Sequence, residues 1–368
     1  MKHVCLTLAM VAAAGTAAGQ DTSMANMPGM GNMAGMNMSM PIPMPPGMKM
    51  MPGLVGISPA ITPFLPGQGV DLATLAPVKP TAVTTLADGD TLVLTAGLVR
   101  RTIGKRTFTM YAFNGEIPGP LIRVRENATI TVRFRNHIDL PSAVHWHGVR
   151  LDNANDGVPD LTQKAVAPGD SFTYRLHFPD AGVYWYHPHV REDIEQAMGL
   201  FGNMLVDSPD PAYYSPVNRE QVLMLNDLLI NADTLIPFAK SGPDFTLMGR
   251  AGNVMLVNGE PHYALHVATG DVVRFFMTNA SSSRTYNLSF GGAPIKIVAS
   301  DVSRFEYEES VPSIIVAPAE RYIAEVRFPH AGTYPLLNAV QVINHYTGEF
   351  SQEVDTLGVV TVDPAPAK

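Results

Sequence analysis

The chain has 368 residues, which is enough for two domains of ordinary size with a tail left over. Its 33 acidic and 25 basic residues give a modest negative charge without a basic stripe. Nucleic acid is therefore not an expected partner, because phosphate binding needs clustered lysine and arginine. The 31 glycines and 31 prolines favour strands and turns over helices.

The first nineteen residues predict a secretory signal peptide. Lys2 and His3 form a short positive start, an apolar stretch covers 4–14, and small residues precede Gln20, as a signal peptidase requires. The apolar stretch is too short to span a bilayer and no later one is longer, so we expect no transmembrane segment. We therefore expect an exported protein, periplasmic or extracellular.

The single cysteine, Cys5, lies inside this predicted signal. A lipid-attachment cysteine would follow the apolar stretch, so its position argues against a lipid anchor. We expect the mature protein to have no thiol, which excludes disulfides, cysteine-based zinc sites and a cysteine nucleophile.

Residues 20–80 predict a disordered, methionine-rich tail. Eleven methionines fall between Met24 and Met51, interleaved with Gly, Pro, Asn and Ser, and they follow neither a helical nor a strand period. Thioether sulfur is a soft ligand that favours Cu(I), so one interpretation is a tail that captures cuprous ion. The other is a low-complexity tether whose methionines bind nothing.

Past Pro80 the sequence changes to short runs of β-branched and aromatic residues bounded by turn residues, which predict strands. Only 192–200 indicates a brief helix or turn. Many short strands at near-regular spacing are typical of sandwiches or barrels. The clearest predicted strands are Thr91–Thr95, Thr107–Phe113, Thr129–Phe134, Ser171–Phe178 and Val183–His187.

The chain also repeats itself after about one domain's length. Asn114–Glu116 recurs as Asn258–Glu260 at an offset of 144, and the segment that begins at Val166 recurs from Val316 at an offset of 150. Two homologous sandwiches follow, with a proline-rich boundary near Ser208. The expected segments are a signal peptide over 1–19, a tail over 20–80, a first domain over 81–209 and a second domain over 210–368.

Four of the eleven histidines form two H-x-H pairs in the first repeat, His145 with His147 and His187 with His189. Residues i and i+2 of a strand share a face about 6.5–7 Å apart, so each pair presents two imidazoles to one side. Four neutral nitrogen donors in one volume suit copper, zinc, iron or nickel, and Cu(II) binds most tightly among the first-row divalent ions. One pair could arise by chance, but two pairs flanked by aromatic residues predict a metal site.

The second repeat lacks these histidines. Leu337 and Ala339 stand at the positions that match His187 and His189, and the segment opposite the first pair, 286–289, contains no histidine. If the fold itself required the histidines, the second copy would need them too. We therefore interpret the four as site residues and the second domain as structural.

The order of these motifs resembles the first two domains of multicopper oxidases. The resemblance covers nearly everything after residue 80 and implies an all-β fold of two cupredoxin-like Greek-key β-sandwich domains. In the first repeat it is carried by Asn114–Pro120, His145–Gly148, Asp156–Gly157 and Tyr184–His189, and in the second by Asn258–Gly259, Arg274, Asn279–Ala280 and Ala317–Tyr322.

The resemblance also implies roles for individual residues. His145 would bind the type 2 copper, and His147, His187 and His189 would bind the type 3 pair. Asp156 would be the catalytic carboxylate that relays protons to dioxygen as it is reduced to water. The alternative for Asp156 is a turn residue within Asn-Asp-Gly, a common turn signal.

In this family a third domain brings the type 1 copper, which needs a thiolate, and the other half of the cluster's histidines. We expect this chain to be inactive alone and to act as an oxidase only if a separate chain or oligomer supplies a third cupredoxin domain. The expected partners are copper ions and O2, with Cu(I), another metal ion or a phenol as the reducing substrate. One alternative is a non-catalytic exported copper-binding or copper-tolerance protein, and another is a cupredoxin scaffold that has lost copper.

Overall fold

The computed structural model describes residues 64–366 apart from 231–233, 239–249, 302 and 345–347. The predicted signal peptide and the methionine cluster of the tail lie outside the described residues. Residues 64–80 differ from the prediction of a disordered tail, because their backbone pairs with the first strands. The backbone N–H of Val78 donates to the carbonyl of Arg100 at 3.0 Å, for example.

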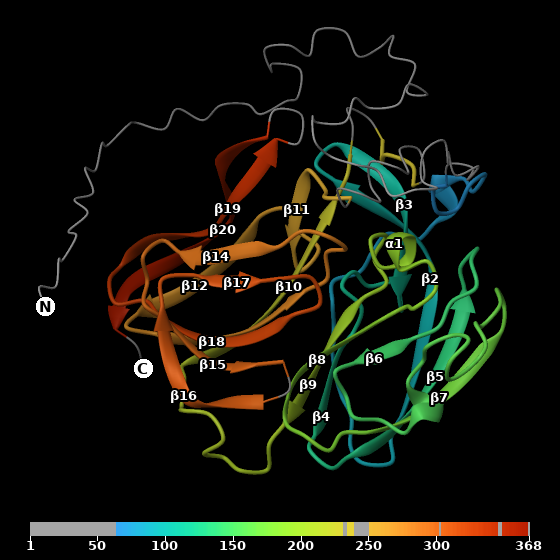
Figure 1. Ribbon diagram of the computed structural model, residues 1–368, viewed down its shortest axis with the longest axis horizontal. Helices are drawn as coiled ribbons and strands as arrows, with labels where there is room; N and C mark the ends of the chain where they lie inside the picture. The colour runs from blue at the N-terminus through green and yellow to red at the C-terminus, as the bar shows by residue number, and fades with distance from the viewer. Residues whose placement is uncertain (1–63, 231–233, 239–249, 302, 345–347, 367–368) are drawn as a thin grey trace, which may run out of the picture. The chain divides into compact units, whose positions relative to one another are not determined.

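Two sheets that share one hydrophobic core form the first half of the described chain (Figure 1). One sheet has the order β1-β4-β9-β8-β6, and the other β3-β2-β5-β7. Their strands are β1 (Val83–Thr85), β2 (Thr91–Ile103), β3 (Arg106–Phe113), β4 (Leu121–Arg125), β5 (Thr129–His137), β6 (His145–His147), β7 (Ser171–His177), β8 (Gly182–His187) and β9 (Gly202–Asp207). Short helical turns are η3 (Leu72–Thr74), η4 (Asn153–Asn155) and α1 (Glu192–Glu195).

A second pair of sheets encloses its own core in the second half. One has the order β11-β10-β13-β18-β15-β16, and the other β12-β20-β19-β14-β17. Their strands are β10 (Arg219–Leu228), β11 (Val254–Val257), β12 (Tyr263–Thr269), β13 (Val272–Asn279), β14 (Tyr286–Phe290), β15 (Ile295–Ser300), β16 (Ser303–Val311), β17 (Ile314–Val316), β18 (Arg321–Arg327), β19 (Gly332–Asn344) and β20 (Glu349–Pro366).

The two sandwiches share a strand pattern. In the first, β4 runs parallel to β9, β9 antiparallel to β8, and β8 antiparallel to β6. In the second, β12, β20, β19 and β14 repeat these three relations in the same order. The prediction of an all-β fold is confirmed, whereas the domain boundary near residue 209 stays a prediction. Within the described part of the chain, no helix is long and apolar enough to cross a bilayer.

Strand β2 runs eight residues beyond its predicted end at Thr95. The extension contains Arg100 and Arg101, whose charge hides the strand pattern. Arg101 is nevertheless buried, because its guanidinium forms an ion pair with Glu260 of the second sandwich at 2.8 Å. Residues 96–103 pair with β3, from Ala96 opposite Phe113 to Ile103 opposite Arg106, so the hairpin with β3 extends the strand.

An apolar cluster joins the two sandwiches. It combines residues of β8 and β9 with residues of β13, β15 and β18, namely Val183, Leu205, Phe276, Val298, Ala299 and Ile323. Gln196 adds a polar contact, since its Nε2 donates to the carbonyl oxygen of Ala280 at 2.9 Å. Gln196 therefore holds the first sandwich against the second.

Candidate metal centre

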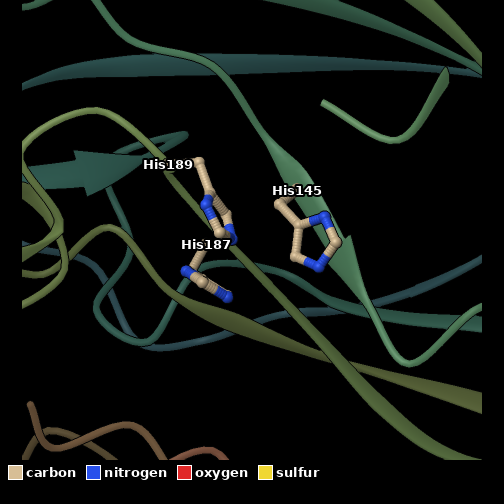
Figure 2. A group of neighbouring side chains, drawn as sticks. All are labelled: His145, His187 and His189. Carbon is tan, nitrogen blue, oxygen red and sulfur yellow. The ribbon is translucent and has the colours of Figure 1, made fainter. Parts of the chain in front are cut away.

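Strands β6 and β8 bring the two predicted histidine pairs together. The strands are antiparallel, and their register sets His145 opposite His187 and His147 opposite Trp185. Directly paired residues point to the same face of a sheet, so both imidazoles of β6 share a face with His187. His189 follows two residues after the end of β8. Figure 2 shows the rings of His145, His187 and His189 turned toward a common space.

The ring nitrogens are close enough to share metal ions. One nitrogen each from His145, His187 and His189 lies within 4.8 Å of the other two. Nδ1 of His147 lies 3.3 Å from Nε2 of His187, which adds the fourth imidazole to the group. The structure thus brings together all four histidines that the sequence singles out, and whether they bind metal stays a prediction.

Backbone carbonyl groups hold two of the rings in place. Nδ1 of His145 donates to the carbonyl oxygen of Asp156 at 2.7 Å, and Nδ1 of His187 donates to that of Pro188 at 2.9 Å. In each ring the proton on Nδ1 leaves Nε2 with a free lone pair. The Asp156 carboxylate lies beside the same ring, with Oδ1 3.5 Å from Nδ1 of His145.

A carboxylate holds a third ring. Oε1 of Glu192, in the first turn of α1, lies 2.9 Å from Nδ1 of His189. A carboxylate on the far nitrogen fixes the orientation of a metal-binding imidazole and makes it more basic. Sequence reasoning missed Glu192, although its place three residues after a candidate ligand, at the start of a predicted helical turn, is a usable signal.

The surroundings lower the pKa of three of the four imidazoles, those of His145, His147 and His187. Burial lowers the pKa of His187 well below its usual value, and the neighbouring histidines lower it further. Burial, with a smaller effect of the Arg321 cation, lowers the pKa of His147 to about 3. Burial also lowers the pKa of His145, although the hydrogen bond to Asp156 opposes this shift. Neutral imidazoles keep the lone pairs that metal binding needs.

Gly157 makes the tight turn that sets Asp156 against the first histidine. Its φ is +76°, which disfavours any residue with a Cβ atom. A Cβ atom there would also collide with the carbonyl oxygen of Val144, the residue before β6. The turn that the Asp-Gly pair predicts from sequence is therefore present, and it packs directly against the strand that carries His145.

Two further residues border the site. The ring of Trp185 stacks on His187, with centroids 4.1 Å apart and planes 18° from parallel, and it shares a face with His147. Arg321 reaches in from β18, where its Nε lies 3.4 Å from the carbonyl oxygen of Val183. Strand alternation before His187 could have indicated Trp185, but no local pattern points to Arg321.

Comparison with known proteins agrees with this geometry. Two family models, both described as multicopper oxidase, match residues 98–211 and 219–360. The crystal structure of a multi-copper oxidase from Pseudomonas thermotolerans superposes with a TM-score of 0.65 at 27% identity, over 78% of this chain and 66% of that one. The likeness confirms the prediction of cupredoxin-like sandwiches.

Curated relatives include two bacterial copper proteins. The copper resistance protein A homolog of Pseudomonas syringae pv. tomato is 37% identical over 134 residues, which are 36% of this chain and 22% of the relative. The multicopper oxidase MmcO of Mycobacterium tuberculosis is 28% identical over 277 residues, 67% of this chain and 53% of the relative. This chain thus spans about a fifth of the first relative and about half of the second. It belongs to the multicopper oxidase family, whose cofactor is copper.

Proposed function

We propose that the chain supplies half of a trinuclear copper site, which couples one-electron oxidation of a substrate to the reduction of O2 to water. His145 would bind the type 2 copper, and His147, His187 and His189 the type 3 pair. The observation that carries the proposal is the convergence of four imidazoles on one space, with three of their ring nitrogens within 4.8 Å of one another.

The donor set fits copper. The rings of His145 and His187 donate Nδ1–H to a carbonyl oxygen and leave Nε2 bare, and Nδ1 of His147 faces the bare Nε2 of His187 at 3.3 Å. Nδ1 of His189 lies 2.9 Å from a carboxylate oxygen of Glu192. Imidazole nitrogen is a good ligand for copper, and burial favours the neutral, metal-binding form of His145, His147 and His187. The second sandwich serves as an internal comparison, because its matching strands β14 and β19 carry no histidine.

Copper bound here would accept electrons singly and pass them to O2. The residues of the chain hold and orient the ligands, and Asp156 has a further role. Reduction of O2 to two waters consumes four protons, so a carboxylate beside the cluster is needed. Asp156 is about one-third exposed at its side chain and lies 3.5 Å from His145, so its Oδ atoms can take protons from solvent and release them at the site.

The remaining ligands and the type 1 copper would come from a third cupredoxin domain outside residues 1–368. A type 1 site needs a thiolate, and the sequence contains one cysteine, Cys5, at a position where a signal peptide is predicted. We further propose that the protein is exported, that the methionine-rich tail binds Cu(I), and that Cu(I), another metal ion or a phenol is the reducing substrate. The copper resistance protein among the relatives supports Cu(I) as the reducing substrate.

Copper loading of the full chain tests the site. We expect the wild-type chain to bind Cu(II) with nitrogen hyperfine structure in its electron paramagnetic resonance spectrum. His187→Ala should lose this signal. His266→Ala is the matched control, because His266 is an exposed histidine on β12 of the second sandwich and should leave the spectrum unchanged.

Oxygen uptake tests the division of the active site between domains. With Cu(I) or a phenol, the copper-loaded chain alone should consume O2 no faster than the uncatalysed reaction does, because electrons have no type 1 copper through which to enter. Catalytic turnover by residues 1–368 would refute the proposed dependence on a third domain. Equal copper binding by the wild type and His187→Ala would refute the metal site itself.

A further inference from the structure

A row of side chains extends from the metal centre toward the boundary between the two sandwiches. The register of β6, β8 and β9 pairs His147 with Trp185, and Trp185 with Asn203. Paired residues point to the same face of a sheet, so all three lie on the face that carries the histidines. The row therefore connects the metal centre with β9.

The second sandwich presents a matching row across β18, β13 and β10. The register pairs Arg321 with Thr278, and Thr278 with Met224. Arg321 is one end of this row and contacts β8, where its Nε lies 3.4 Å from the carbonyl oxygen of Val183. Met224 marks the other end, because it lines the same cleft as Asn203. Thr278 is the middle residue of this row and lies between these two ends.

Polar atoms between the two rows have no protein partner. Nε1 of Trp185, Oγ1 of Thr278 and both amide atoms of Asn203 are buried, and none has a hydrogen-bond partner among the described residues. Asn203 is 3% exposed and Thr278 is fully buried. Buried polar groups are almost always paired with protein or with ordered water. Three such residues in adjacent positions indicate a hydrated seam rather than a dry contact.

The seam opens to solvent at one end. Asn203 and Met224 line a cleft of about 590 Å³ between the sandwiches, together with Lys79, which is exposed. Leu205 and Phe276 belong to the apolar cluster that joins the sandwiches; they line the same cleft and are adjacent to the polar rows on the same strands. Water can therefore enter at the cleft and is confined by the apolar contact beside it.

The inner end lies behind the histidines. The ring of Trp185 stacks on His187 and lies 5.1 Å, centroid to centroid, from the ring of His147. The indole N–H at the edge of that ring has no protein acceptor within the described residues. The seam thus ends at an aromatic ring that contacts two of the proposed ligands.

We propose that ordered water fills this seam, from the cleft at Asn203 to the indole N–H of Trp185, and gives the metal centre an aqueous contact at its back. The water follows from the geometry of the protein alone. Its relevance to a copper site rests on the function proposed above, and the test below needs no copper.

Hydrogen exchange of the two tryptophan indoles tests the seam, and the chain provides its own control. Trp146 is the only other tryptophan, and its Nε1 is also buried, with no hydrogen-bond partner in the part of the chain that the structure describes. Its ring lies inside the core of the first sandwich, 5.4 Å from Tyr174 and 5.7 Å from Tyr186. In the full chain labelled with ¹⁵N-tryptophan, we expect the Trp185 indole to exchange at least ~10-fold faster than that of Trp146. Equal rates, or slower exchange at Trp185, would overturn the proposal.

Two variants locate the path of exchange. Asn203→Leu places an apolar side chain at the mouth of the seam and should slow exchange at Trp185 toward the rate of Trp146. Asn203→Ala leaves the mouth open and should keep the fast rate. If Asn203→Leu is folded and leaves the Trp185 rate unchanged, water reaches the indole from the histidine face and the seam is refuted. If Asn203→Leu does not fold, Asn203→Val is the second apolar substitution at the mouth, and it must likewise slow exchange at Trp185 for the seam to stand.

Discussion

Replacing Glu195 with glutamine is expected to stabilise the protein by an amount that grows with pH. Glu195 ends α1 and is fully buried. The hydroxyl of Ser142 donates to its Oε2 at 2.6 Å, while Oε1 has no partner among the described residues. Burial raises the pKa of Glu195 from 4.5 to about 9, more than the hydrogen bond from Ser142 lowers it. The carboxyl is therefore protonated in the folded protein at neutral pH.

The sign of the effect follows from proton binding. Between pH 4.5 and 9 the folded protein keeps the proton of Glu195 and the unfolded chain releases it, so the free energy of unfolding falls as pH rises. Each pH unit in this window changes that free energy by about 1.4 kcal/mol. At pH 7, ionisation of Glu195 in the unfolded chain thus lowers the free energy of unfolding by about 3 kcal/mol. Glutamine still offers an acceptor to Ser142 and has no proton to release, so this penalty disappears.

Denaturant unfolding at pH 5, 7 and 8.5 measures the effect. The gain in unfolding free energy of Glu195→Gln over wild type should increase across the series, from below ~1 kcal/mol at pH 5 to ~3 kcal/mol at pH 7, and further at pH 8.5. An amide N–H without a partner costs the same at every pH, so only the change with pH tests the reasoning. Glu353→Gln, on the exposed face of β20, should show no such trend. A difference between Glu195→Gln and wild type that is constant from pH 5 to 8.5 would refute a buried, protonated Glu195.

Three further outcomes are expected. Gly157→Ala puts a Cβ atom on a residue with a left-handed φ and makes it collide with the carbonyl of Val144. It should lower the unfolding free energy by at least ~2 kcal/mol in a denaturation experiment and weaken Cu(II) binding in a metal titration. Arg274→Met removes a buried partner of Glu325, which then keeps only Lys296, and should cost about 3 kcal/mol in urea unfolding. Removing bound copper with a chelator should lower the thermal midpoint, and scanning calorimetry before and after chelation checks this.

The sequence predicted the cluster of histidines because the strand period is local. Residues i and i+2 of any strand share a face. His145 and His147 therefore had to point to the same side, and so did Trp185 and His187. The pairing of β6 with β8 was not visible in either segment, but histidines on both strands made it the simplest arrangement. The structure sets His145 opposite His187, as this interpretation requires.

Contacts between the sandwiches could not be predicted in the same way. Arg101 lies in a charged stretch that hides the end of β2, and it becomes buried only because Glu260 approaches from more than a hundred residues away. Arg321 has no histidine near it in the sequence that marks a metal site, yet it contributes to the low pKa of His147. Such residues depend on how two sandwiches pack, and that packing leaves no periodic pattern in the sequence.

The exposure of the histidines indicates the side from which the metal centre would be completed. His187 is 4% exposed and backed by Trp185, and the second sandwich covers that side of the sheet. The side chains of His145 and His189 are 17% and 28% exposed, so the cluster is open to solvent on the side of these two residues. The Asp156 carboxylate lies on the same side, 3.5 Å from His145. A further domain that completes the cluster would therefore cover His145 and His189, and it would enclose the proposed proton donor with the copper ions rather than leave it in bulk solvent.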